Sequence, residues 1–166
     1  MKKLAAMMLC LTLLCACGAQ SAAPKTTGAE GGATTAAKEI SADTVAQALL
    51  DGLTWRDQLE LLDADLRSAV LSAEEADLSQ TAIYISSGAT AEEIAVLVCP
   101  TEEAAERVLE SVKTRVAEQL EAFRNYVPAE VPVLENAVTE RRGNTVVMVV
   151  CDDVQAAQDI LKTALS

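Results

Sequence analysis

The residues of this chain best suited to chemistry lie near its start, in the sequence Leu14-Cys15-Ala16-Cys17. A basic start and a short apolar run precede them, which is the layout of an export signal. A lipoprotein signal peptidase needs a small residue directly before the modified cysteine and a branched apolar residue three positions before it. Cys17 meets both conditions through Ala16 and Leu14, whereas the bulky Leu14 directly precedes Cys15. Cys17 is therefore the predicted lipidation site.

This lipobox predicts how and where the chain is held. Residues 1–16 would be a lipoprotein signal peptide, and Cys17 would carry a thioether-linked diacylglycerol. The apolar run from Leu4 to Leu14 is too short for a hydrocarbon core of about 30 Å, which needs about 20 helical residues. We therefore expect a lipid-anchored protein on the extracytoplasmic face of the cell membrane. The alternatives are an ordinary secretory signal that is cut elsewhere and a cytoplasmic protein with an apolar start.

Composition divides the rest of the chain in two. Residues 17–39 are rich in Ala, Gly, Thr and Ser and carry no large apolar residue, so we predict that they form a disordered tether after the lipidated cysteine. Residues 40–166 are long enough for one domain with one core. Because the chain has one Trp, two Tyr and one Phe, this core must be largely aliphatic.

The charge balance restricts the partners. Without residues 1–16 the chain keeps 11 of its 13 Lys and Arg and all 25 Asp and Glu, which gives a net charge of −14, and it has no His. A surface this acidic is repelled by nucleic acid and by anionic lipid headgroups. We therefore expect no nucleic-acid partner, and membrane contact through the diacylglycerol on Cys17 alone.

Hydrophobic spacing and capping residues predict the elements of residues 40–166. Helices are predicted at 42–52, 59–70, 102–124 and 154–165, and strands at 81–86, 94–99, 133–140 and 145–151. The order is α-α-β-β-α-β-β-α. It predicts an α+β fold, a single domain with a four-stranded mixed sheet packed by helices.

The two most apolar strands, 94–99 and 145–151, are predicted to lie in the middle of that sheet, with 81–86 and 133–140 at its edges. Gly143-Asn144 is a favoured hairpin dipeptide. If helix 102–124 crosses over the sheet before this hairpin, the two central strands should be parallel.

Cys99 and Cys151 each end one of these central strands. Parallel strands would make them neighbours at one end of the sheet, at a distance that permits a disulfide. Side chains that point the same way fit the disulfide torsion of about 90° poorly. No histidine is present to activate a thiol, and two isolated cysteines do not form a zinc site. We predict buried free thiols, with a disulfide as the alternative.

Asp152-Asp153 follow a strand and precede a helix, where open sheets often place ligand-binding groups. They are the candidate ligand residues, and helix capping is the alternative. The chain has no phosphate-binding glycine loop, nucleophile elbow or dinucleotide fingerprint. No catalytic, cofactor-binding or metal-binding residue is therefore predicted, and no cofactor.

Four short segments support a resemblance through their order and spacing. They are Ala91-Glu-Glu-Ile-Ala-Val, Tyr126-Val-Pro128, Leu134-Glu-Asn-Ala137 and Gly143-Asn-Thr-Val146. Over residues 43–165 the chain resembles a family of small lipoproteins of Gram-positive, clostridial-type bacteria that carry a domain of unknown function. The resemblance implies the outer face of a cytoplasmic membrane and an α+β domain. It implies no activity, cofactor or site residue.

Two functions remain open from the sequence. The first is a non-enzymatic binding or accessory module at the membrane surface, with a protein or small-molecule ligand. The second is a carboxylate-dependent surface hydrolase, assisted by a divalent cation. A cleft that gathers Asp152, Asp153 and another acid would favour the hydrolase, whereas a sheet covered by helices on its faces would favour the binding module.

Overall fold

Two fully buried strands form the centre of the sheet, β3 (Glu93–Val98) and β5 (Thr145–Val150). The structure, a computed structural model, describes residues 40–166. Its sheet has five strands in the order β1-β2-β3-β5-β4, and all neighbours are antiparallel. The outer strands are β1 (Glu60–Leu61), β2 (Gln80–Ile85) and β4 (Val138–Arg142).

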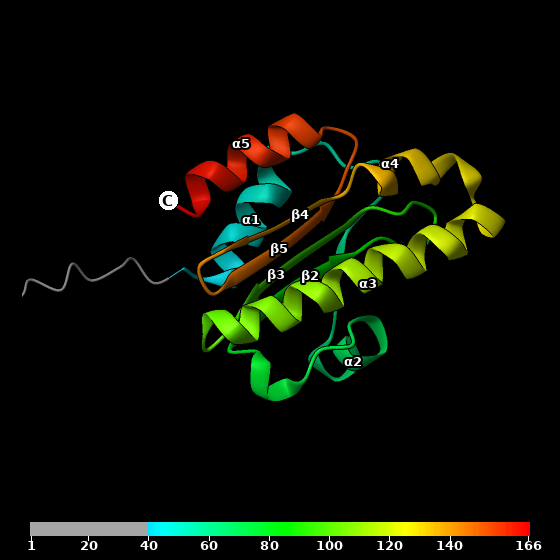
Figure 1. Cartoon of the computed structure of the whole chain (residues 1–166). Helices are drawn as coiled ribbons and strands as arrows, with labels where there is room; N and C mark the ends of the chain where they lie inside the picture. Colours follow the sequence, from blue (N-terminus) through cyan, green and yellow to red (C-terminus); the bar gives the residue numbers. More distant parts are fainter. Residues whose placement is uncertain (1–39) are drawn as a thin grey trace, which may run out of the picture. The chain divides into compact units, whose positions relative to one another are not determined.

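Helices cover both faces of this sheet (Figure 1). Helices α1 (Ala42–Gly52) and α5 (Val154–Ala164) pack on one face, and the 25-residue α3 (Glu102–Tyr126) packs on the other. Successive strand residues point to opposite faces, so Val96 enters the core under α1 and α5 while Leu97 enters the core under α3. This explains why the central strands are apolar without alternation.

Capping side chains fix where the three long helices begin. The side-chain oxygens of Ser41, Thr101 and Asp153 each accept a hydrogen bond from the backbone amide three residues further on. Such a bond satisfies an amide that has no partner within the helix. The predicted helices 42–52, 102–124 and 154–165 are confirmed within two residues at each end.

The predicted sheet is wrong in two respects: it has five strands rather than four, and it is antiparallel rather than mixed. Strands 94–99 and 145–151 are central, as predicted, but they run antiparallel. The crossover through α3 makes β3 parallel to β4, and the hairpin at Gly143-Asn144 then reverses β5 into the space between them. Gly143 has a φ of 56°, which glycine adopts without steric cost.

The predicted helix 59–70 is replaced by a strand and short turns. Glu60–Leu61 pairs with Ile85 and Tyr84 of β2, because an uncovered strand edge offers hydrogen-bonding groups that outweigh the helical spacing of the leucines. A 3₁₀ turn at Ala64–Leu66 and the one-turn helix α2 (Arg67–Val70) follow.

The predicted strand 133–140 begins late. Residues Pro128–Glu130 form a 3₁₀ turn and Val131–Glu135 form the short helix α4, each with a proline in its first turn. The fixed φ of proline fits this position, where its missing N–H has no partner to lose. Strand β4 therefore starts only at Val138.

The antiparallel arrangement separates the two cysteines. Val98 pairs with Thr145 and Glu93 pairs with Val150, so Cys99 and Cys151 lie at opposite ends of the sheet, about 22–24 Å apart along the strand direction at 3.2–3.4 Å per residue. The prediction that they are neighbours is wrong, while the prediction of free, buried thiols is confirmed. Burial raises the pKa of each thiol to about 11.

Cys17, the predicted signal peptide 1–16 and the predicted tether 17–39 lie outside the described residues. Within residues 40–166, no helix combines the length and the apolar character that crossing a membrane would require.

Candidate functional site

One arginine gathers three carboxylates where β3 begins and β5 ends. The guanidinium of Arg56 donates to both oxygens of Glu130, at 2.6 and 2.7 Å. Its Nε lies 3.0 Å from Asp152 Oδ2 and 3.5 Å from Glu92 Oε1. The side chains of Glu92 and Glu130 are 0% and 5% exposed, and that of Asp152 is 52% exposed. We call these four residues the Arg56 cluster.

Glu92 also binds the backbone before β1. Its carboxylate accepts hydrogen bonds from the amides of Arg56 and Asp57, at 2.9 and 3.0 Å, and from the hydroxyl of Thr90 at 3.0 Å. Glu130 similarly accepts a bond from the amide of Ala91. A buried carboxylate needs such partners to compensate for lost hydration. The cluster therefore fixes the loop of residues 53–59 against the end of the sheet.

The electrostatics of the cluster favour the ionised form of Glu130. Hydrogen bonds from Arg56 lower the pKa of Glu130 below its usual value, against the effect of burial, and the amide of Ala91 lowers it further. The same hydrogen bonds raise the pKa of Arg56. A general acid needs the opposite, a raised pKa near neutrality. This arrangement suits a structural anchor better than proton transfer.

The two sequence candidates have different places. Asp152 belongs to the Arg56 cluster. Asp153 caps α5 by accepting a bond from the amide of Ala156 at 2.9 Å, so for this residue the capping alternative holds. Within residues 40–166, no three Cys, Asp or Glu side chains are grouped closely enough to hold a metal ion.

Another buried carboxylate lies on the opposite face of the sheet. Glu93, 3% exposed in its side chain, accepts from Arg115 at 2.9 Å and from the amide nitrogen of Gln119 at 2.7 Å. Glu92 and Glu93 are consecutive and therefore point to opposite faces. Each has its own arginine.

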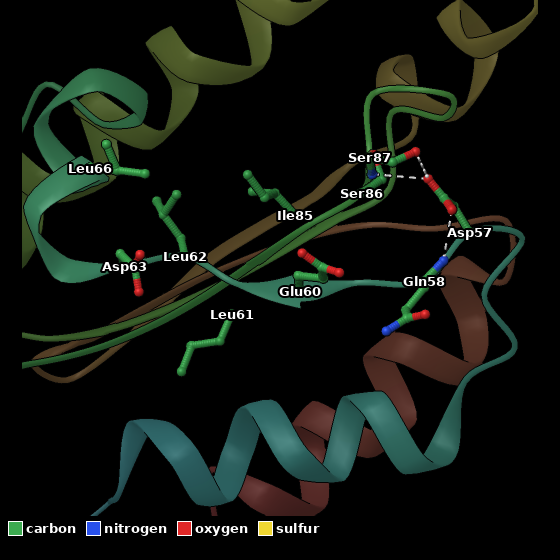
Figure 2. A pocket seen from close by; sticks show the side chains of 10 residues that line it. All are labelled: Asp57, Gln58, Glu60, Leu61, Leu62, Asp63, Leu66, Ile85, Ser86 and Ser87. Atoms are coloured by element: carbon green, nitrogen blue, oxygen red, sulfur yellow. Dashed lines mark hydrogen bonds between the residues drawn. The ribbon is translucent and has the colours of Figure 1, made fainter.

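Beside the loop of residues 53–59, a hollow of about 440 Å³ opens at the β1 edge of the sheet (Figure 2). Asp57 lies at one end of it, where its carboxylate accepts from the hydroxyl and the amide of Ser87, at 2.5 and 2.9 Å. These hydrogen bonds lower the pKa of Asp57. Asp57 follows directly after Arg56, so the cluster positions this end of the hollow.

The other end of the hollow is apolar. Leu62, which directly follows β1, lies beside Ile85 of β2, and Leu66 faces them from the turn before α2 (Figure 2). Leu61 points to the opposite side of the strand, where it borders a second hollow of about 210 Å³. The two hollows share Leu61, Leu62 and Asp63. We call them together the edge groove.

The edge groove combines exposed apolar surface with negative charge. Leu61 and Leu66 are 59% and 53% exposed, among the most exposed large apolar residues of the described domain. The carboxylates of Glu60 and Asp63 have no hydrogen bond or ion pair within residues 40–166. Arg67 also borders the groove, but its guanidinium lies 3.1 Å from the carboxylate of Glu75.

Sequence reasoning missed most of these residues. Arg56, Glu130 and the groove acids carry no motif, and their partners lie far away along the chain: Arg56 and Glu130 are 74 residues apart. One signal was available at Glu92-Glu93, since two acids that lead directly into an aliphatic strand predict buried, paired carboxylates.

The domain is a helix-covered antiparallel sheet with an ion-anchored loop and a groove at one edge. Its family is established by comparison: residues 68–151 match the model of DUF4358, a domain of unknown function, and the chain belongs to that family. The match includes Glu92, Glu93 and Glu130, whereas Arg56 and Asp152 lie outside it. No curated protein and no solved structure matches the chain.

Proposed function

We propose that this protein is a lipid-anchored binding or accessory module on the extracytoplasmic face of a cell membrane, without enzymatic activity. The lipobox ending at Cys17 supports the anchoring. The edge groove supports the binding, and it is the observation on which the proposal depends. Its exposed leucines lie beside carboxylates, and the buried charges of the Arg56 cluster hold in place the loop of residues 53–59 that leads into the groove. A pre-organised surface of this kind loses little entropy on binding.

The alternative, a carboxylate-dependent hydrolase, has less support. Asp152 does lie with two further acids, but Asp153, which that alternative also needs in the cleft, instead caps α5. Glu92 and Glu130 are moreover buried and occupied by Arg56 and backbone amides, so neither is free to hold a water or a cation. Both faces of the sheet are covered by helices, which leaves its edge as the accessible part.

Anchoring is tested by Cys17→Ser. The serine cannot form the thioether, so we expect loss of fatty-acid incorporation and accumulation of the larger, uncleaved precursor. Metabolic labelling with a radioactive fatty acid and gel mobility measure both effects. Cys15→Ser is the matched control and should be labelled like the wild type. Labelling that persists in Cys17→Ser, or that disappears in Cys15→Ser, would show that Cys17 is not the lipidated cysteine.

Binding through the edge groove is tested by site-specific photocrosslinking in intact cells. A photoreactive amino acid at Leu61, which is exposed in the groove, should give a discrete crosslinked adduct. The same amino acid at the exposed position Gln158 of α5, outside the groove, should not. Equal adducts at both positions, or none at Leu61, would contradict a binding role for this surface.

A further inference from the structure

The outer edge of β2 is only partly covered. Strand β2 has six residues, but β1 pairs with just two of them, Tyr84 and Ile85, and one further bond runs from the amide of Leu62 to the carbonyl of Ile83. In the described part of the chain the first three residues, Gln80–Ala82, pair with β3 on their inner side, but no strand lies on their outer side. The second hollow of the edge groove opens here, bordered by Thr81 and Ile83.

An exposed strand edge is a template for an added strand, and extended peptides bind many domains in this way. Backbone hydrogen bonds then supply affinity, and pockets for alternate side chains supply specificity. Both features are present at β2, because its uncovered residues border the second hollow together with Leu61 and Leu62. The first hollow adjoins the second at Leu61, Leu62 and Asp63. The groove therefore suits an extended chain that carries apolar side chains.

The charge of the groove selects among such chains. Four acids border it, Asp43, Asp57, Glu60 and Asp63, and the guanidinium of its one basic residue, Arg67, is bound to Glu75. A second copy of this protein would bring a chain of net charge −12 and the same acidic edge, and like charges at an interface oppose association. Complementarity instead favours a basic segment.

On the basis of the binding function above, we propose that the edge groove takes up an extended basic peptide segment of a partner protein. The segment adds to the sheet beside Gln80–Ala82 of β2, places apolar side chains against Leu61 and Leu62, and places Lys or Arg side chains beside Glu60 and Asp63. The partner is thus a protein with an accessible, positively charged strand or tail.

The test uses the full-length chain in detergent and five probes. A capped peptide of alternating Lys and Val is the mimic, and its charge-reversed form of alternating Glu and Val is the first control. Two further forms of the Lys-Val peptide carry an N-methyl group on every second residue, one on the Lys residues and the other on the Val residues. Each form lacks the amide donors along one edge of the extended peptide. Spermine supplies cationic charge without a peptide backbone. Calorimetry or amide chemical shifts measure the affinity.

We expect the Lys-Val peptide to bind at least about tenfold more tightly than the Glu-Val peptide and spermine. One N-methylated form should lose binding and the other should keep it. Affinity should fall as the salt concentration rises from about 0.05 M to about 0.5 M, because exposed charges are screened. Chemical shift changes should centre on residues 60–66 and 80–85.

A pair of matched variants identifies the groove charges. Glu60→Gln with Asp63→Asn should weaken the Lys-Val peptide several-fold. Glu118→Gln with Glu135→Gln removes the same net charge from exposed helix positions outside the groove and should leave its affinity unchanged. An equal loss of affinity in both double variants would mean that the peptide responds to the overall charge of the protein, and it would overturn the edge groove as the binding site.

The remaining outcomes are also decisive. Spermine binding as tight as that of the peptide, or unchanged binding of both N-methylated forms, would overturn strand addition. Equal affinity for the Lys-Val and Glu-Val peptides, or no binding of either, would overturn the proposal that the partner segment is basic. The acids of the groove would then serve only to prevent the open strand edges of separate copies from pairing. Crosslinking at Leu61 in cells judges the proposed binding function separately, because it assumes nothing about the partner's charge.

Discussion

Val96→Asp is expected to leave the domain unfolded. Val96 lies in the central strand, has no exposed surface and faces Ala82 and Val147 across the sheet. The aspartate would place an unpaired charge in an aliphatic core, which costs several kcal/mol even after relaxation. A domain of this size has a total stability of about 5–15 kcal/mol. Circular dichroism and the dispersion of amide resonances measure the loss.

Ala117→Asp is the matched control, since it adds the same charge at an exposed position of α3. It should cost less than about 1 kcal/mol, mostly through helix propensity. Native spectra and an unchanged melting curve for Val96→Asp would show that β3 is not a buried central strand.

Arg56→Ala is expected to lower the free energy of unfolding by about 3 kcal/mol, because removing one partner of a buried ion pair leaves the others uncompensated. The value lies at the low end of the range for buried pairs, since the Arg56 side chain is 37% exposed and water can reach part of the site. Urea unfolding measures the change. Arg124→Ala breaks an exposed pair with Glu121 and should cost less than about 1 kcal/mol.

The same variant has a characteristic pH dependence. In the wild type the pKa of Glu130 is lowered from 4.5, so its ion pair stabilises the fold at neutral pH and this contribution is lost as the pH falls through the lowered value. In Arg56→Ala the buried carboxyl takes up a proton more readily, which relieves the uncompensated charge. The stability difference between the two proteins should therefore narrow from pH 7 to about pH 4. A stability difference that stays constant over this pH range would mean that Arg56 does not stabilise the fold through its ion pair with Glu130.

Local signals in the sequence were sufficient for most of the elements. The aliphatic run of residues 145–151, the turn at Gly143-Asn144 and the capping residue of α3 each act over a few residues, so short windows reveal them. The direction of β5 relative to β3 depends on how α3 and β4 return to the sheet, and no short window of sequence contains that information. For the same reason β1 was missed, because its two residues become a strand only beside β2.

The site was less accessible to prediction than the fold. Asp152 was selected from its position after a strand, and it does lie in a charged cluster. The arginine and the two glutamates that make that cluster come from three separate segments, and only tertiary packing brings them together. The edge groove is likewise a property of surface shape, because its leucines have the spacing of an ordinary core helix.

The two consecutive glutamates have a consequence for how the strands align. A central strand made of aliphatic residues could slide past its neighbours with little penalty, since each side chain would meet another of similar shape. A shift of β3 by one residue moves every side chain to the opposite face. A shift that moved Glu92 into the place of Glu93 would bring Glu92 beside Arg115, but it would move Glu93 into the place of Ile94, in the aliphatic core under α1 and α5 and without a donor. Charge therefore selects a single alignment of β3 that apolar packing alone would leave degenerate.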